Sequence, residues 1–199
     1  MRYDAEHKER TRQRVLKVAA KAIRADGPHR IGVAAVMAEA GLTHGGFYAH
    51  FDSKDDLVAA SIDEMFRQGA KRFEGETEGA VGASALSRYI DFYLSADHRD
   101  SKGIGCPLPY LSGDAPRLSD RSRAAFAAGV AGLAERLAAL LQALGREDAP
   151  GEASSLLAEM VGALALARAD PDRARSDMIL GRSRASLKAR FGLEPHHER

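Results

Sequence analysis

The sequence contains a single cysteine, Cys106, among its 199 residues. One thiol cannot form a disulfide within the chain, and it cannot supply a cysteine-based zinc site. Such low cysteine use is typical of proteins from a reducing compartment. The composition therefore excludes a disulfide-stabilised fold, and we expect neither a metal site nor any other cofactor.

We also interpret the sequence as lacking long apolar runs and an export signal. We find no run near the length that crosses a bilayer, and Met1 is followed by a charged stretch without an apolar segment. We therefore expect a cytoplasmic protein with no membrane contact. The length allows one or two domains, and 45% hydrophobic residues are enough for a core.

The alternation of apolar and polar residues that marks β-strands is absent as well. Apolar residues recur instead at the spacing of helices. Beyond the amino-terminal region, the pattern predicts helices over 53–74, 82–96, 117–144, 152–169 and 171–191, with Pro171 as the first residue of the last one. Residues 97–116 are rich in glycine and proline and form the one long irregular region. We predict an all-α fold.

The net charge is only +1, which is small for a protein that binds nucleic acid. The charge is unevenly spread, because residues 8–30 hold eight basic residues against Glu9 and Asp26. A helix there would place Arg10, Arg14, Lys17, Lys21 and Arg24 on one face and Val15, Leu16, Ala19 and Ile23 on the other. Arg10 and Arg14 lie nearest its start and are candidates for phosphate contact. The alternative is an ordinary solvated face.

Residues 33–51 read as two short helices joined at a glycine. The first carries apolar residues at helical spacing, namely Val33, Val36, Met37 and Ala40. Gly41 can adopt the left-handed conformation that ends such a helix, and Thr43 can cap the next one by accepting a backbone N–H. This order predicts a helix-turn-helix.

The second helix opens with Gly45 and Gly46, although each glycine costs about 1 kcal/mol relative to alanine. Their small size lets a phosphate approach the free N–H groups of the first turn. Phe47 and Phe51 lie four residues apart and can both enter the core. Four polar or aromatic side chains then face outward, namely Thr43, His44, Tyr48 and His50. Lys54 follows just after the helix. The set favours contact with DNA over simple helix packing, which is the alternative.

These residues carry a resemblance to a known family. The segment 11–65, with Gly-Leu-Thr-His-Gly-Gly-Phe-Tyr-Ala-His-Phe-Asp-Ser-Lys-Asp-Asp-Leu at 41–57, resembles the DNA-binding domain of TetR/AcrR transcriptional regulators. The resemblance implies a three-helix DNA-binding domain over 1–53 and a helical ligand-binding and dimerisation domain over 54–199. It also implies a repressor that a small molecule releases from DNA, and a homodimer that pairs through the last two helices.

Dimerisation also follows from the size of the motif. One short helix reads few base pairs, whereas two copies related by a two-fold axis reach successive major grooves about 34 Å apart. We therefore expect a palindromic double-stranded operator. The candidate DNA-binding residues are Arg10, Arg14, Arg30, Thr43, His44, Gly45, Gly46, Tyr48, His50 and Lys54, of which Thr43 and His44 would read bases.

One position departs from the family pattern. The first helix of the motif often begins with Ser or Thr, which caps it and touches phosphate, and here Gly32 stands near that place. Glycine can still cap a helix. The missing hydroxyl removes one contact, and we expect Arg30 to supply it.

The effector is left open by the sequence. Aromatic side chains of the central helices are candidates to line an apolar pocket, namely Phe66, Tyr89, Phe92, Tyr93, Tyr110 and Phe126. Cys106 precedes Pro107, which favours the start of a short helix over 107–113, and a thiol at that end is more reactive. The family resemblance suggests Cys106 as an electrophile sensor; the alternative is a small buried residue. His98 and Arg99 would suit an anionic or aromatic effector.

Two other classes of function compete with a DNA-binding regulator. An enzyme could use Cys106 as nucleophile and His98 as base, but no third group to orient them is evident. A helical protein-interaction module would not predict the basic first helix or the glycines that open the second helix of the motif. We expect no enzymatic activity.

Overall fold

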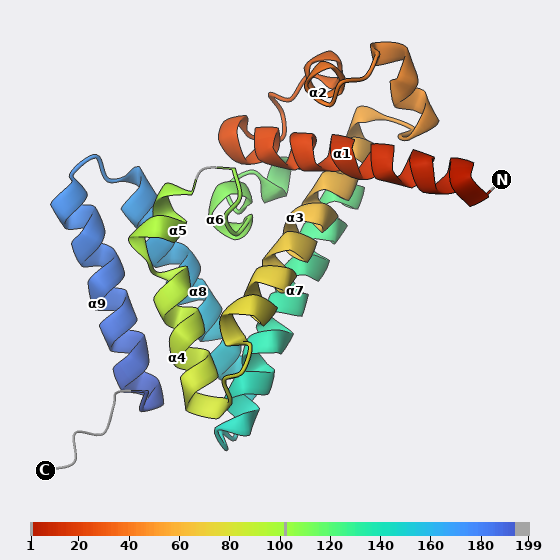
Figure 1. Cartoon of the computed structure of the whole chain (residues 1–199). Helices are drawn as coiled ribbons and strands as arrows, with labels where there is room; N and C mark the ends of the chain where they lie inside the picture. Colours follow the sequence, from red (N-terminus) through yellow and green to blue (C-terminus); the bar gives the residue numbers. More distant parts are fainter. Residues whose placement is uncertain (1, 102, 194–199) are drawn as a thin grey trace, which may run out of the picture. The chain divides into compact units, whose positions relative to one another are not determined.

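The computed structural model describes residues 2–101 and 103–193, with side chains from Glu6 onward. Every regular element in these residues is helical (Figure 1), as the sequence predicts. The α-helices are α1 (Arg2–Asp26), α2 (Val33–Glu39), α3 (Lys54–Thr77), α4 (Gly82–Tyr93), α5 (Ala96–Asp100), α6 (Leu108–Leu111), α7 (Asp120–Ala143), α8 (Ala149–Ala169) and α9 (Arg173–Phe191). Two segments are 3-10 helices, η1 (His44–Ala49) and η2 (Ala115–Arg117).

The chain folds into two compact units. Among the described residues, the first unit holds 2–69 and 103–129, and the second holds 70–101 and 130–193. The long helices α3 and α7 contribute to both units. The irregular region after α5 therefore folds with the amino-terminal helices, which the sequence does not suggest. The division at residue 54 expected from the family resemblance concerns function and stays a prediction.

The core of the first unit is formed by the apolar faces of its helices, which pack against one another. The stripe of α1 that includes Val15 and Ile23 meets Met37 of α2 and Ile62 of α3, all of them fully buried. Leu111, which lies within the irregular region at the end of α6, is buried in the same cluster. Burying one such side chain stabilises the fold by about 1.5–3 kcal/mol, so residues 103–118 are held to the amino-terminal helices by their apolar contacts.

The start of α3 is capped by Ser53 and Asp56. The Oγ atom of Ser53 accepts a hydrogen bond of 3.1 Å from the N–H of Asp56. The carboxylate of Asp56 accepts one of 3.1 Å from the N–H of Asp52 and pairs with Arg121 at 2.7 Å. These bonds satisfy the amide groups that a helix start leaves open.

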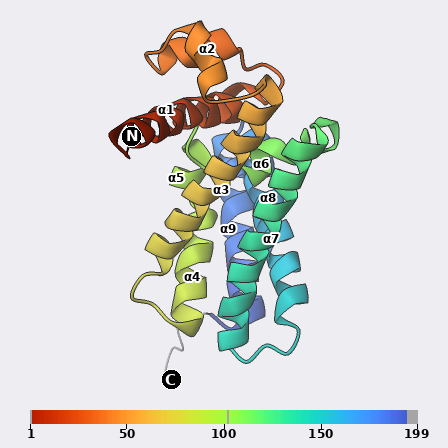
Figure 2. The ribbon, with the colours of Figure 1, turned by 90° about the vertical axis from the view of Figure 1, so that its right-hand side faces the viewer.

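In the second unit, α8 and α9 lie side by side (Figures 1 and 2) and α4 also contacts α9. Each of the two paired helices begins with an aspartate cap: Asp148 accepts from the N–H of Gly151, and Asp172 accepts from Ala174 and Arg175. Pro171 lies just before the cap of α9, so its expected place as the first helical residue was wrong. Proline still suits that place, because it cannot donate a backbone hydrogen bond.

Four other predicted boundaries differ from the structure, the first being that of α8, which begins at Ala149 and not at Glu152. The helix predicted over 82–96 ends at Tyr93, because Ser95 caps a separate helix, α5, by accepting from the N–H of His98 at 3.0 Å. The helix predicted to end at residue 74 continues to Thr77, where α3 ends. The helix expected from residue 117 begins at Asp120, after the short η2.

One helix contradicts the expectation about apolar runs. By length and composition alone, α7 could cross a membrane. Its alanines count as apolar although they are small, and only Glu135 and Arg136 are charged between residues 124 and 141. Core helices of soluble proteins meet the same test, so α7 is weak evidence for a membrane span.

Candidate nucleic-acid interface

The first half of the helix-turn-helix is built as the spacing predicts. Val36 and Met37 bury one face of α2. Gly41 has φ of +70°, a conformation that only glycine adopts without strain. The N–H of Gly41 donates to the carbonyl of Ala38, and the N–H of Leu42 donates to that of Met37, both at 2.9 Å. This pair of bonds is the usual glycine-ended helix stop, and it sets the direction of the next element.

The second half is a 3-10 helix, so the prediction of an ordinary helix was wrong for η1. Two adjacent glycines lower helix propensity, and 3-10 geometry is common in pieces this short. Thr43 occupies the cap position, but its side chain makes no capping hydrogen bond, which corrects the second expectation. Neither glycine is required by the fold, because a Cβ at Gly45 meets nothing within 4 Å and one at Gly46 makes ordinary contacts of 3.7 Å.

Two phenylalanines anchor η1 to the core. Phe47 and Phe51 are 2% and 1% exposed, and their rings stack with centroids 5.6 Å apart. Tyr48 points the other way and is 71% exposed, and Thr43 and His44 are exposed as well. No acidic residue occurs between Thr43 and Phe51. The outer surface of η1 is therefore free of carboxylates and rests on a rigid aromatic base.

His50 is only half-exposed, although the spacing places it outside. The described residues offer no hydrogen-bond partner to its Nδ1 atom, which is buried. Burial lowers the pKa of His50, and the positive charges of Lys8 and Arg12 lower it further. Arg12 lies over the ring of Phe51 at 5.0 Å. The amino-terminal half of α1 thus packs beside the end of η1, which explains why His50 is partly covered.

Exposed basic side chains lie on other elements of the same unit as η1. Lys54 donates from Nζ to the carbonyl of His29 at 3.1 Å, in the turn that leads to α2, and Arg30 in that turn is exposed. On α1, Arg14 is exposed, and Arg10 is exposed with Glu6 at 4.0 Å. Gly32 is the cap of α2 and has no side-chain bond to offer.

Arg24 was predicted on the same basic face of α1, and this was wrong. Its side chain is 4% exposed and is hydrogen bonded within the first unit. Helix periodicity alone cannot distinguish a buried arginine from an exposed one when the acceptors come from a distant part of the chain.

Comparison with known proteins agrees with this geometry. Residues 15–61 match the family described as "Bacterial regulatory proteins, tetR family". A TetR transcriptional regulator from Chloroflexus aurantiacus superposes with a TM-score of 0.80 at 25% identity, over 94% of this chain and 96% of that one. The helix-turn-helix region is thus a TetR-family DNA-binding domain, and the chain has the fold of a TetR-family transcriptional regulator.

Two further solved structures share the fold of this TetR-family chain. A TetR-family regulator from Cytophaga hutchinsonii has a TM-score of 0.78 at 21% identity, covering 92% of this chain and 96% of its own. The reduced form of NemR from E. coli has a TM-score of 0.73 at 22% identity, covering 90% of this chain and 96% of its own. No curated protein shows significant sequence similarity to the chain.

The effector candidates of this TetR-family chain divide between the two units. In the first unit, Phe66 and Phe126 meet edge to face at 5.9 Å, and Tyr110 packs against the same core. A Cβ at Gly129 would lie 2.1 Å from the ring of Phe66, so only glycine lets α7 approach it. Cys106 is half-buried in this unit and precedes α6, which spans only Leu108–Leu111 instead of the predicted 107–113.

The other candidates form an aromatic group in the second unit. Tyr89 lies 6.1 Å from Phe92 and 5.9 Å from Tyr93, measured between ring centroids. The ring of His98 stacks on Phe92 at 5.0 Å and meets Tyr93 at 4.9 Å. Its Nδ1 lies 2.8 Å from the carbonyl of Tyr93. Burial lowers the pKa of His98 to about 4, so the ring is neutral at pH 7.

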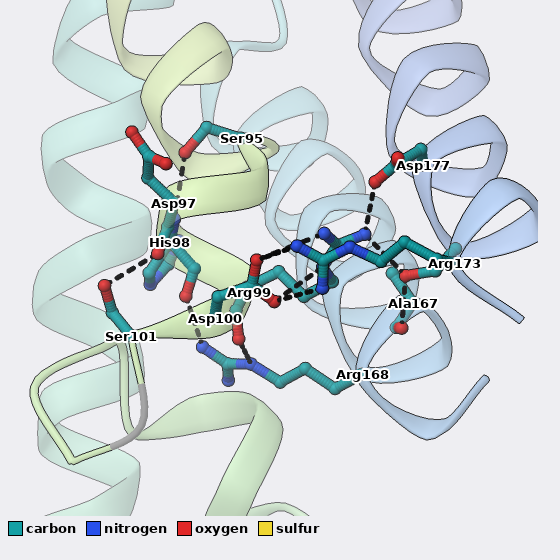
Figure 3. A network of polar contacts seen from close by, with 11 residues as sticks. Ser95, Asp97, His98, Arg99, Asp100, Ser101, Ala167, Arg168, Arg173 and Asp177 are labelled. Atoms are coloured by element: carbon teal, nitrogen blue, oxygen red, sulfur yellow. Dashed lines mark hydrogen bonds and ion pairs between the residues drawn. The ribbon is translucent and has the colours of Figure 1, made fainter. Parts of the chain in front are cut away.

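Arg99 is committed to a buried polar network (Figure 3). Its guanidinium donates to Asp100 at 2.9 Å, to Asp177 at 2.5 Å and to the Oγ of Ser176 at 2.7 Å. Arg168 donates to the carbonyls of His98 and Arg99. These contacts join α5 to α8 and α9. The expectation that His98 and Arg99 attract an anionic effector is therefore not supported, because one is neutral and the other is bound to carboxylates.

Proposed function

We propose that this TetR-family protein is a dimeric repressor that binds a palindromic operator and leaves it when an effector binds. The observation that carries the proposal is the exposed surface of η1, which holds no carboxylate and is supported by Phe47 and Phe51. Exposed basic residues on α1, in the turn before α2 and at the start of α3 lie in the same unit. We assign DNA binding to residues 1–53 and effector binding and dimerisation to 54–199.

The proposed contacts follow from where each side chain lies. Thr43 and His44 at the start of η1 would read base edges, and the bare backbone of Gly45 and Gly46 would lie close to phosphate. Tyr48 and Lys54 would bind the DNA backbone, which receives half or more of the hydrogen bonds in such interfaces. Four further residues complete the proposed phosphate contacts: Arg10, Arg14, Arg30 and His50.

Dimerisation through α8 and α9 is supported by apolar side chains that these helices leave exposed. Leu166 on α8 is 63% exposed and Met178 on α9 is 42% exposed. Contiguous exposed apolar surface is typical of an interface, and a two-fold pair suits a palindromic site. A monomeric mass at micromolar concentration would contradict this part of the proposal.

The effector is proposed to be a small molecule or an electrophile. The aromatic residues Phe66, Tyr110 and Phe126 of the first unit and Tyr89, Phe92 and Tyr93 of the second remain candidates to line its site, and Cys106 remains a candidate sensor. If Cys106 senses electrophiles, Cys106→Ser should bind the operator normally and resist release by N-ethylmaleimide. Equal release of both proteins would remove Cys106 as the sensor. We place this regulator in the cytoplasm, without membrane contact.

The direct test is to recover bound sequences from a random pool of DNA duplexes and to measure binding as salt rises. We expect two half-sites related by a two-fold axis, with centres about 34 Å apart. The logarithm of the binding constant should fall linearly with the logarithm of the salt concentration, because phosphate contacts release counterions. The proposal would be contradicted if no sequence were enriched, or if the binding constant did not change with salt concentration. Either result would favour a protein-interaction role.

A further inference from the structure

Arg24 in the last turn of α1 holds a loop from a distant part of the chain. Its Nε donates to the carbonyl of Gly105 at 2.9 Å, and its Nη1 donates to the carbonyl of Gly103 at 3.2 Å. Its Nη2 donates to the side-chain oxygen of Gln68 on α3 at 3.1 Å. One planar guanidinium thus binds two loop carbonyls and a second helix in fixed directions.

The network continues into α3. Gln68 donates at 2.7 Å to Glu64, whose side chain is 2% exposed and also accepts from Arg67 at 2.8 Å. A buried charge is costly unless it is hydrogen bonded and paired. Glu64 and Arg24 are both buried and both bonded to Gln68, so the position of each depends on the other.

The loop is shaped for this contact. Gly103 has φ of +95°, and a Cβ there would lie 3.1 Å from Cγ of Lys21 on α1. Any other residue at this position would be strained and would press against α1. Ile104 between the two carbonyls is 73% exposed, so this part of the loop is held through its backbone.

The same turn of α1 is tied to the helix-turn-helix. Lys21 pairs with Glu39 of α2 at 3.7 Å, and the N–H of Gly27 donates to the carbonyl of Ile23 at 2.9 Å to end α1. The turn that follows leads into α2 and receives the hydrogen bond from Lys54 at His29. A displacement at the end of α1 would therefore reach α2 and η1.

We propose that Arg24 is a positioning residue that couples the place of the 103–105 loop to the geometry of the DNA-reading helices. The inference rests on the proposed function and adds the route by which it is regulated. A shift of the loop would remove two acceptors from a buried guanidinium, and the last turn of α1 would move to restore them. The loop runs directly into Cys106 and α6, so an effector acting on this segment would reach the operator surface within the first unit.

The test is a double-mutant cycle read by affinity for the recovered operator duplex, using fluorescence anisotropy. Gly103→Ala strains the loop, and Arg24→Lys keeps the charge but loses the planar fork. We expect Gly103→Ala to weaken binding about tenfold in the wild-type background, within the usual range of allosteric coupling, and less than about threefold when Arg24 is lysine. Equal losses in both backgrounds, or no loss in either, would overturn the inference.

A control and a second readout separate coupling from damage to the fold. Gly113 lies in the same segment, and a Cβ there meets nothing within 4 Å, so Gly113→Ala should bind normally. Hydrogen exchange of the amides of residues 33–51 should rise in Gly103→Ala only when Arg24 is present. If Arg24→Lys does not fold, Arg24→Gln replaces it. Wild-type protein that bound no DNA would contradict the proposed function, and hydrogen exchange would still decide the coupling.

Discussion

Among the side chains that the structure describes, each compact unit contains one buried arginine, and the two are held in different ways. Arg24 and Arg99 are both 4% exposed. Arg24 donates to two glycine carbonyls and an amide oxygen. Arg99 donates to the carboxylates of Asp100 and Asp177 and to a serine hydroxyl. The first set of acceptors belongs partly to a loop, whereas the second comes from side chains on α5 and α9.

Because their acceptors differ, Arg24 makes contacts that a small shift can break, whereas Arg99 makes contacts that hold two helices together. The bonds of Arg99 to carboxylates join two opposite charges, whereas those of Arg24 join a charged donor to neutral oxygen atoms. The hydrogen bonds from Arg99 and then Arg173 hold the pKa of Asp100 far below its usual range, so this carboxylate keeps its charge in mild acid. Arg99 therefore fastens α5 to α9, whereas the loop bonds of Arg24 end on backbone carbonyls that a small shift can withdraw.

The largest expected effect is that acid destabilises the second unit by protonating His98, the neighbour of Arg99. The neutral ring is the buried form, with a pKa of about 4 against 6.5 for the exposed imidazole. Between pH 6.5 and 4 the unfolded chain binds more protons, so the free energy of unfolding falls as pH is lowered. The loss approaches about 3 kcal/mol. It should be measured by urea unfolding across this range.

Two variants make the acid test specific to His98. His98→Gln should lose most of the slope, because the side chain that titrates is gone. The same change at the exposed His29 should leave the slope as it is in the wild type. A slope that persists in His98→Gln would show that other groups carry the acid sensitivity.

Removing the fixed arginine should have the next largest effect. Arg99→Met should reduce the free energy of unfolding by about 2 kcal/mol, since it deletes charge-assisted bonds of a buried group. Arg173→Met is the matched control, because Arg173 also binds Asp100 but is 64% exposed, and exposed pairs contribute less than about 1 kcal/mol. Urea unfolding measures both. Equal losses would mean that burial does not distinguish the two arginines.

Much of the helix-turn-helix is predictable from local sequence. The spacing of Phe47 and Phe51 predicts their burial, and the single Gly41 predicts the turn. Each of these depends on residues within about one helical turn. The cap by Thr43 and the helix type of η1 were wrong, because the two glycines that follow weaken regular helical geometry in so short a segment.

Features that depend on distant residues were not predictable. The two loop acceptors of Arg24 lie 79 and 81 residues further along the chain, in a segment without periodicity. The partial burial of His50 comes from the packing of α1 beside η1. The paired glycines of the Gly-Ile-Gly loop were a usable signal for a tightly held backbone, but nothing local names Arg24 as the residue that holds it.

The central claim is that the outer surface of η1 binds DNA, and Tyr48 tests it most directly. Tyr48→Ala removes a side chain that is 71% exposed, so the free energy of unfolding should change by less than about 0.5 kcal/mol. Affinity for the recovered operator should fall about tenfold, which is about 1.4 kcal/mol, because a contact with the DNA backbone is lost. Val81→Ala, at a site that is 85% exposed in the second unit, should bind like the wild type. Normal operator affinity in Tyr48→Ala would contradict the account.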